Sequence, residues 1–252
     1  GIGGNLRRFL SSFLNDRTLR VRVGHARSTP RPVAAGVPQG SVVSPFLFNL
    51  ALARLPAALP TDPHYKVECS IYADDITLWE RGPPQASRHV CLALQRALDT
   101  TAAYLGSIGL SVSTGKTVAL LVHPRAAARR SAPRLQLEGV RIPWSTTVSY
   151  LGLRIDHRLT WRPAVGAMQT HTFRVRKAVS QLLARGEGSS VKWALRLYEA
   201  AATSRLRYAL PLVALPPRRL EKLELQHRAA IRLCLGVPRS SQIAATLAED
   251  GA

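Results

Sequence analysis

The sequence runs Cys69-Ser70-Ile71-Tyr72-Ala73-Asp74-Asp75-Ile76-Thr77-Leu78-Trp79 through the stretch that indicates most about its fold. Two short strand-like runs flank a tight polar turn, so the pattern predicts a β-hairpin with two adjacent carboxylates at its tip. Ionising both carboxylates is favourable mainly when a cation neutralises them, because like charges repel. Hard oxygen ligands suit Mg²⁺, and paired Mg²⁺ ions suit in-line displacement at phosphorus. Taken alone, an ordinary turn rich in aspartate explains these residues equally well.

A second informative segment lies upstream, at Gly36-Val37-Pro38-Gln39-Gly40-Ser41. It is predicted to form a loop in which the backbone can approach a ligand closely, because glycine has no Cβ. Ser44 and Pro45 follow in the order of an N-cap and a proline at the first helical position, which predicts a helix that continues to Leu55. Such a loop can hold an anion, but a plain loop-to-helix junction is the commoner explanation when the loop is taken alone.

The two segments together resemble the palm of a reverse transcriptase, and most closely the polymerases of non-LTR (LINE-type) retrotransposons. The matching residues are Gly36–Asn49 and Tyr72–Asp75. Further segments resemble the same family, so that the resemblance covers about residues 5–185; they are Phe13–Thr18, Gly109–Thr117, Tyr150–Gly152 and Leu159–Trp161. The resemblance implies an α+β fold. It consists of a partial polymerase palm (an antiparallel sheet with helices) over residues 1–134, then a small β-hairpin and an α-helical thumb over residues 135–252.

The resemblance also implies a function, RNA-directed DNA polymerisation by two-metal nucleotidyl transfer. Asp74 and Asp75 would be the catalytic residues that bind Mg²⁺, with Mn²⁺ as a substitute. Pro38, Gln39 and Gly40 would line the nucleotide pocket.

Two further groups of residues receive roles from the same resemblance. Lys116 would act on the pyrophosphate leaving group, where negative charge develops, although a plain exposed loop lysine explains this residue equally well. Tyr150, Leu151 and Gly152 would grip the primer end. The implied partners are an RNA template, a DNA primer and deoxynucleoside triphosphates.

One catalytic aspartate of the family, and its fingers region, precede the segments that match here. We therefore expect a fragment with an incomplete metal site that is inactive by itself. Asp16, Asp62, Glu68 and Asp99 lack the sequence context to replace that aspartate. Two other functions remain open. One is a nucleic-acid-binding remnant of a mobile element without catalysis, and the other is the palm of an RNA-templated RNA polymerase or intron maturase.

The charge of the chain points independently to nucleic acid. Its 35 arginines and lysines outnumber 15 acidic residues, for a net charge of +20. Residues 121–252 carry 22 of the basic residues and eight of the acidic ones. Such an excess predicts binding to polyanions through phosphate neutralisation and counterion release. A gene rich in G and C would also raise the arginine count, but it does not explain so few acidic residues.

The cysteines and the hydropathy pattern exclude other classes of protein. Cys69, Cys91 and Cys234 are odd in number and widely spaced, so they predict neither a disulfide framework nor a zinc site. They suit a reducing intracellular compartment, and for a retrotransposon polymerase we expect nucleus and cytoplasm. No apolar run approaches the roughly 20 residues that a membrane helix needs, so no membrane association is predicted.

Periodicity predicts the remaining elements. A stripe of apolar and small residues predicts one long amphipathic helix, and its members are Trp161, Val165, Met168, Thr172, Val175, Val179 and Leu182. Other helices are expected at 3–14, 85–108, 191–209 and 220–235, strands at 19–23, 117–122 and 148–155, and a hairpin at 135–142. Residues 123–134 are expected to be a basic loop, either a contact to a nucleic-acid backbone or a solvated connector.

Overall fold

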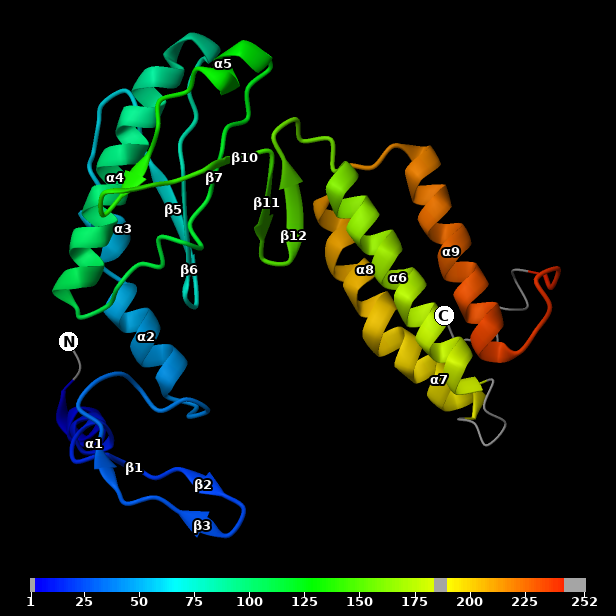
Figure 1. The fold of residues 1–252 in the computed structure, drawn as a ribbon, viewed down its shortest axis with the longest axis horizontal. Helices are drawn as coiled ribbons and strands as arrows, with labels where there is room; N and C mark the ends of the chain where they lie inside the picture. Colours follow the sequence, from blue (N-terminus) through cyan, green and yellow to red (C-terminus); the bar gives the residue numbers. More distant parts are fainter. Residues whose placement is uncertain (1–2, 184–189, 243–252) are drawn as a thin grey trace. The chain divides into compact units, whose positions relative to one another are not determined.

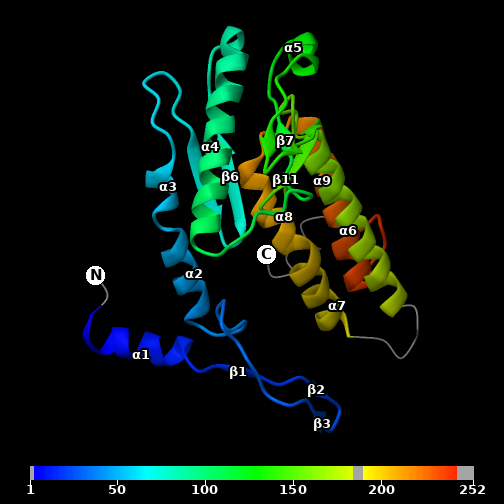
Figure 2. The same ribbon diagram turned by 60° about the vertical axis from the view of Figure 1, so that its left-hand side comes forward.

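The protein is described by a computed structural model that covers residues 3–183 and 190–242. Within these residues the chain forms two compact units, each drawn in Figures 1 and 2. The first holds residues up to Ser113 together with Gln136–Val140, and the second holds Thr114–Leu135 and the residues from Arg141 onward. Helices and short paired strands occur in both, so the fold is α+β, as predicted.

The first unit contains several helices, of which α4 is the longest, and several short paired strands. Its helices are α1 (Gly4–Leu14), α2 (Ser44–Leu52), α3 (Leu55–Ala58), η1 (Pro84–Ala86) and α4 (Ser87–Ser107). Its strands are β1 (Thr18–Leu19), β2 (Arg22–Val23), β3 (Ala26–Arg27), β4 (Arg31–Pro32), β5 (Glu68–Tyr72), β6 (Asp75–Trp79) and β8 (Gln136–Leu137), which pairs with β9 (Val140–Arg141).

The second unit contains a small hairpin and a helical bundle. Its strands are β7 (Ala119–Leu120), β10 (Trp144–Ser145), β11 (Thr147–Tyr150) and β12 (Leu153–Asp156). Its helices are α5 (Ala126–Arg130), α6 (Arg162–Leu183), α7 (Val191–Tyr198), η2 (Glu199–Thr203), α8 (Ser204–Ala209), η3 (Leu210–Leu212) and α9 (Pro217–Leu235).

The strands of the described residues pair two by two. The pairs β1–β4, β2–β3, β5–β6 and β11–β12 are antiparallel, which agrees with the predicted antiparallel pairing. In contrast, β7 and β10 are parallel. Parallel neighbours need a long crossover connection, and the segment between these two strands, which includes α5, is long enough to provide it.

The core of the first unit lies between α3, α4 and the β5–β6 hairpin. Leu55 and Ala97 are fully buried there, and Leu59, Val67 and Ala93 join them. The predicted helix over residues 85–108 is confirmed as α4, which ends before Gly109 with a φ of 77°. Glycine at that place is typical of a helix end, because it enters the left-handed region without a Cβ clash.

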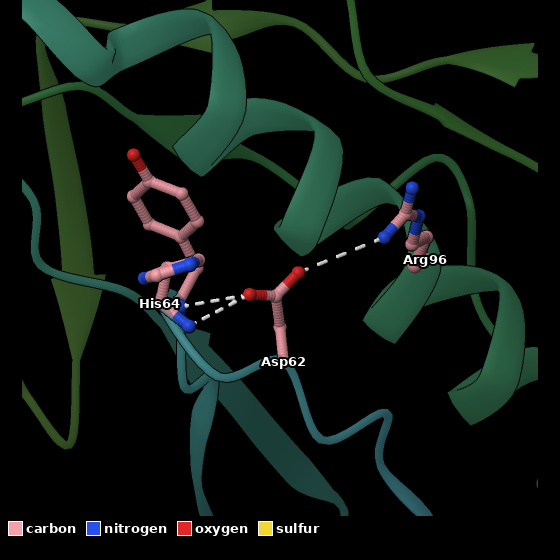
Figure 3. A network of polar contacts seen from close by, with 4 residues as sticks. Asp62, His64 and Arg96 are labelled. Carbon is pink, nitrogen blue, oxygen red and sulfur yellow. Dashed lines mark hydrogen bonds and ion pairs between the residues drawn. The ribbon is translucent and has the colours of Figure 1, made fainter.

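A small polar network secures the loop that leads into β5 (Figure 3). The Asp62 carboxylate accepts hydrogen bonds from the backbone amides of His64 (2.8 Å) and Tyr65 (3.2 Å), and it lies 3.8 Å from the Arg96 guanidinium. The hydrogen bond from His64 is the main reason that the pKa of Asp62 is lowered. This carboxylate therefore orders the chain just before the hairpin.

The bundle of the second unit has two buried clusters. One contains Val165 and Met168 of α6, Leu206 of α8 and Leu223 of α9. The other is built around Tyr198 of α7, with Val179, Ile231 and Cys234 among its members. Since α6 is amphipathic with the predicted stripe on its buried side, most of the stripe lies in these clusters.

Leu182 is the exception, and its predicted place in the core is wrong. Its side chain is 44% exposed, and Leu183 packs on the cluster in its place. An α-helix has 3.6 residues per turn, so a stripe written with a period of 3.5 drifts by about 20° per heptad. After three heptads from Trp161 the buried position has moved to the next residue.

The expected helix over residues 191–209 is not uniform. Its middle segment, Glu199–Thr203, is π-helical, and α7 and α8 flank it. The Nε2–H of His171 on α6 donates a hydrogen bond to the carbonyl of Ala201, at 2.8 Å. This bond satisfies a carbonyl in the stretch where the regular α-helical pattern is interrupted.

The strand expected over residues 19–23 is interrupted at Arg20 and Val21, since β1 pairs with β4 and β2 pairs with β3. Three further local predictions are wrong. The expected basic loop over residues 123–134 contains the short helix α5, because its Ala-Ala-Ala-Arg-Arg segment consists of strong helix formers. The helix from Ser44 stops at Leu52, before Pro56, and α3 starts anew at Leu55. The single strand expected over residues 148–155 is divided by a turn at Leu151–Gly152.

Candidate functional site

The β5–β6 hairpin places two carboxylates at its turn, as predicted. Tyr72 pairs with Asp75, and Ala73 and Asp74 form the turn between them. Ala73 has a φ of 50°, in the left-handed region, as the first position of a tight hairpin turn requires. Asp74 and Asp75 are both exposed. Their oxygens are therefore free to meet a cation together with its water shell.

The face of the hairpin that points to the core explains why the turn lies at these residues. Cys69 pairs with Leu78, and Ile71 pairs with Ile76, and all four pack on the cluster around α4. A shift of one residue in the pairing would turn these side chains toward solvent. The apolar pairs thus set the register, and the register sets the position of the aspartates.

The Pro-Gln-Gly loop forms a tight turn before α2. The amide of Ser41 donates to the carbonyl of Pro38 at 3.3 Å, and Gly40 has a φ of 86°. A positive φ at the third residue is what a type II turn requires, and glycine adopts it without strain. No other atom lies within 4 Å of the position where a Cβ of Gly40 would be. Gln39 and Gly40 are exposed, so the backbone is open to a ligand here.

Ser44 fastens this turn to α2, in a way that differs from the prediction. It was expected to be the N-cap, but it is the first residue of the helix, and the N-cap residue is Val43. The buried Ser44 hydroxyl donates to the carbonyl of Pro38 at 2.6 Å. The prediction that Pro45 lies in the first turn of the helix is confirmed. A proline at this position loses no helical hydrogen bond, because the amide there has no partner within the helix.

Arg17 is a residue that the sequence analysis did not single out. Its guanidinium donates to the carbonyl of Gly36 at 2.7 Å and to the carbonyl of Leu14 at 3.0 Å. It thus ties the start of the loop to the end of α1. Arg17 lies within the Phe13–Thr18 stretch that resembles the family. Its place in that stretch is the signal that the sequence offers for this role.

One helix supports both candidate segments of the first unit. The Tyr104 hydroxyl of α4 donates to the carbonyl of Ala51 in α2, at 2.7 Å. The β5–β6 hairpin packs on the same helix, through the cluster that includes Ala93 and Ala97. The loop before α2 and the carboxylate turn are therefore both anchored to α4.

The other predicted site residues belong to the second unit. Lys116 is exposed in a turn in which the amide of Thr117 donates to the carbonyl of Thr114 at 3.3 Å. Tyr150 ends β11, and Leu151 and Gly152 form the two-residue turn to β12, with φ values of 45° and 81°. The structure thus divides the predicted residues between the two units.

Asp156 was also missed, and it joins the β11–β12 hairpin to α6. Its buried carboxylate accepts hydrogen bonds from the amide of Arg158, the hydroxyl of Thr160 and the amide of Trp161, at 3.2, 3.1 and 3.0 Å. Burial raises the pKa of Asp156, but the hydrogen bonds from Thr160, Arg158 and Trp161 outweigh it and lower the pKa. An aspartate followed four and five residues later by Thr-Trp at a helix start was the signal available in the sequence.

The donor set at Asp74 and Asp75 fits a hard divalent cation. Mg²⁺ is commonly held by one or two carboxylates, with waters and substrate phosphates completing its shell. Elsewhere in the described residues, no three histidine, cysteine, aspartate or glutamate side chains gather into a group that could hold a metal.

The basic side chains of the described residues are mostly without acidic partners. The ion pairs found there are Arg96–Asp62, Arg207–Glu199 and Arg228–Glu224. On α6, Arg174 and Lys177 are exposed, whereas Arg176 lies over the ring of Phe173, at 5.4 Å from its centroid. The cysteines are unbridged, and burial raises the pKa of the Cys69 and Cys91 thiols.

Among the described helices, none combines the length and apolar character of a membrane span.

Comparison with known proteins gives a consistent result. The family description "reverse transcriptase (RNA-dependent DNA polymerase)" matches residues 5–155. A probable RNA-directed DNA polymerase from transposon BS of Drosophila melanogaster is 35% identical over 179 residues, which is 70% of this chain and 19% of that protein. The RNA-directed DNA polymerase from mobile element jockey of Drosophila funebris is 27% identical over 238 residues, covering 91% of this chain and 25% of the relative.

A polyprotein from the type-1 retrotransposable element R2 of Popillia japonica is 28% identical over 165 residues, which is 60% of this chain and 22% of the relative. The chain thus spans about a fifth to a quarter of the length of these relatives. The matched region includes both the Pro-Gln-Gly loop and the carboxylate hairpin. The chain belongs to the reverse transcriptase family, in its non-LTR (LINE-type) retrotransposon branch.

Proposed function

We propose that this chain forms the palm and thumb part of an RNA-directed DNA polymerase, with the palm in its N-terminal half and the thumb in the helical bundle. The observation that carries the proposal is the exposed pair Asp74–Asp75 at a hairpin turn, in a chain whose residues 5–155 match the reverse transcriptase family. The substrates would be an RNA template, a DNA primer and deoxynucleoside triphosphates.

In this proposal the carboxylates of Asp74 and Asp75 hold Mg²⁺ beside the nucleotide phosphates. Bound Mg²⁺ supplies Lewis-acid stabilisation of the charge that develops on the phosphoryl oxygens. The open backbone at Gly40 admits the incoming nucleotide, and the exposed Gln39 amide offers hydrogen bonds to its sugar. Ser44 holds this turn in place by its bond to Pro38, so that the turn has its shape before the nucleotide binds.

The remaining residues act on the leaving group and on the primer. The Lys116 ammonium neutralises the pyrophosphate as it departs, because charge accumulates there in the transition state. The Tyr150–Gly152 turn holds the primer end. Unpaired arginines and lysines of the bundle, such as Arg174 and Lys177 of α6, contact the phosphates of the duplex behind it.

Primer extension tests this proposal. The chain is joined to the N-terminal part of the transposon BS polymerase, since it spans only a fifth of that relative. The joined polymerase is assayed on poly(rA) with an oligo(dT) primer, dTTP and Mg²⁺. We expect extension by the joined polymerase, none by the 252-residue chain alone, and a loss of about 10²- to 10³-fold with Asp74→Asn.

Asp99→Asn provides the matched control. Asp99 is an exposed aspartate on α4 that accepts a hydrogen bond from Gln95, a bond that asparagine can also accept. This substitution should leave extension unchanged. Full activity of Asp74→Asn would refute the assignment of the metal ligands. Binding of primed duplex without any extension by the joined polymerase would instead favour a nucleic-acid-binding remnant.

A further inference from the structure

A tyrosine of the bundle reaches the turn that separates β11 from β12. The hydroxyl of Tyr208 on α8 donates a hydrogen bond to the carbonyl of Leu151, at 2.8 Å. These residues are 57 positions apart in the sequence. Figures 1 and 2 both show the β11–β12 hairpin beside α6 and α8 of the same unit. The bond therefore links the bundle to the backbone of a single turn.

That turn has an unusual composition for its geometry. Leu151 and Gly152 both have positive φ values, as the two central residues of a type I′ turn do. Asparagine, aspartate and glycine are favoured at the first position, while leucine is disfavoured there because its Cβ crowds the backbone. A hydrogen bond to the carbonyl of Leu151 from outside the hairpin favours this conformation over its alternatives.

Two arginines and several apolar residues surround the bond. A small pocket beside the turn is lined by Gly152, by Arg154 of β12 and by Arg205 and Tyr208 of α8, together with apolar residues that include Leu153 and Met168. Arg205 and Tyr208 are three residues apart, so they share one face of α8. Arginines from two elements thus line the pocket beside the turn, which favours a phosphodiester as the group that binds there.

The ring of Tyr208 is not part of the buried core, since this residue is 49% exposed. Tyr198 of the same bundle is different: it is 2% exposed, and its hydroxyl is hydrogen-bonded to Nδ1 of His227 at 2.9 Å inside the core. The first tyrosine is anchored to the hairpin turn, and the second belongs to the packing of the bundle.

We propose that Tyr208 is a positioning residue for the primer end, and that it acts by holding the Leu151–Gly152 turn in its strained conformation. This inference rests on the proposed function, in which the same turn grips the primer. It identifies a group on the helical bundle that controls the geometry of the grip without touching the reacting atoms.

The test compares Tyr208→Phe in two backgrounds of the joined polymerase. With Leu151 present, Tyr208→Phe should lower kcat/KM for the primed template by about three- to tenfold, the effect of one hydrogen bond, while the KM for dTTP stays the same. With Leu151→Asn the turn carries the favoured Asn-Gly pair, and Tyr208→Phe should then have no effect.

Tyr198→Phe serves as the matched control, because it removes a hydroxyl from the same bundle. It should lower the midpoint of thermal unfolding and leave the kcat/KM for primed template unchanged at temperatures where the protein is folded. An equal effect of Tyr208→Phe in both backgrounds, or no effect in either, would overturn the inference.

Failure of the proposed function is distinguishable from failure of this inference. If the joined polymerase does not extend a primer at all, two measurements on the 252-residue chain still test the positioning role of Tyr208. Tyr208→Phe should speed hydrogen exchange at the amides of the Leu151–Gly152 turn, and it should weaken binding of a duplex with a recessed 3′ end by about three- to tenfold. Unchanged exchange or unchanged affinity would count against the positioning role.

Discussion

Asp156 holds the start of α6 through three hydrogen bonds on one buried carboxylate. Replacing it with asparagine keeps the shape of the side chain, but it removes the charge and one acceptor. Since bonds to a charged group are stronger than neutral ones, we expect Asp156→Asn to lower the free energy of unfolding by about 1–3 kcal/mol at pH 7. Urea unfolding followed by circular dichroism measures this, with Asp99→Asn as an exposed control.

The same carboxylate predicts how stability depends on pH. Its pKa is lowered in the folded protein, so its contribution is complete above the pKa of the unfolded chain, about 3.9, and is lost as the pH falls through the folded value. The difference in unfolding free energy between the wild type and Asp156→Asn should therefore shrink below about pH 4. A difference of equal size at pH 3 and pH 7 would show that the charge of Asp156 contributes nothing.

Gly40 and Gly106 should respond to alanine in opposite directions. Neither has an atom within 4 Å of a built Cβ, so only the backbone conformation distinguishes them. Gly40 has a φ of 86°, where alanine is strained by about 1 kcal/mol or more, whereas Gly106 lies in the last turns of α4, where alanine is the better helix former.

We therefore expect Gly40→Ala to destabilise the protein and to raise the KM for dTTP in the joined polymerase. Gly106→Ala should stabilise the protein by up to about 1 kcal/mol and leave that KM unchanged. Thermal unfolding and steady-state extension measure both quantities. A rise in the KM with Gly106→Ala would mean that the effect of Gly40→Ala is not local to the loop.

Among the elements, the β5–β6 hairpin was predictable because polar residues interrupt its apolar alternation at the turn, and the β11–β12 turn was not. The β5–β6 hairpin follows from alternation on both sides of Asp74 and Asp75, so the carboxylate pair was located from the sequence. Apolar alternation also continues through Leu151, so the sequence predicted an unbroken strand there. Leucine is not a typical turn residue, and its positive φ is accompanied by a hydrogen bond from Tyr208, which is distant in the sequence.

Contacts that a side chain makes outside its own helix or strand could not be predicted for the same reason. Local patterns describe which residues face the core, as they do for α4 and α6. They do not indicate that Arg17 reaches the carbonyl of Gly36, or that Ser44 donates to Pro38 and leaves the N-cap to Val43. The positions of the candidate residues were thus predictable, and the groups that hold them were not.

For the molecule as a whole, the net charge of +20 predicts a steep salt dependence of nucleic-acid binding. Each phosphate contact contributes about 0.9 to the slope of log K against log salt on B-form DNA. Arg174→Gln and Lys177→Gln each remove an exposed charge of α6, so the slope should fall by about one unit for each phosphate that is no longer neutralised. Fluorescence anisotropy with duplex at several salt concentrations measures it.

Two variants of the 252-residue chain separate charge from folding in that experiment. Arg228 is already paired with Glu224, so Arg228→Gln should change the slope less than Arg174→Gln does. Met168 is buried, so Met168→Ala should destabilise the bundle by about 2–5 kcal/mol and leave the slope of the folded protein unchanged. Equal slopes for Arg174→Gln and the wild type would mean that α6 does not contact the phosphates.

The π-helical segment Glu199–Thr203 has a consequence for the evolution of this bundle. A π-helical turn behaves like an α-helix that has gained one residue, and each residue of an α-helix advances the side chains by about 100°. Removing one residue from this segment would restore a regular helix but rotate Arg205 and Tyr208 away from the hairpin. The extra residue of this π-helical turn, with the bond from His171 to the carbonyl of Ala201, thus determines which side of α8 faces β11 and β12. Relatives that lack the extra residue should accordingly hold this turn with side chains at other positions.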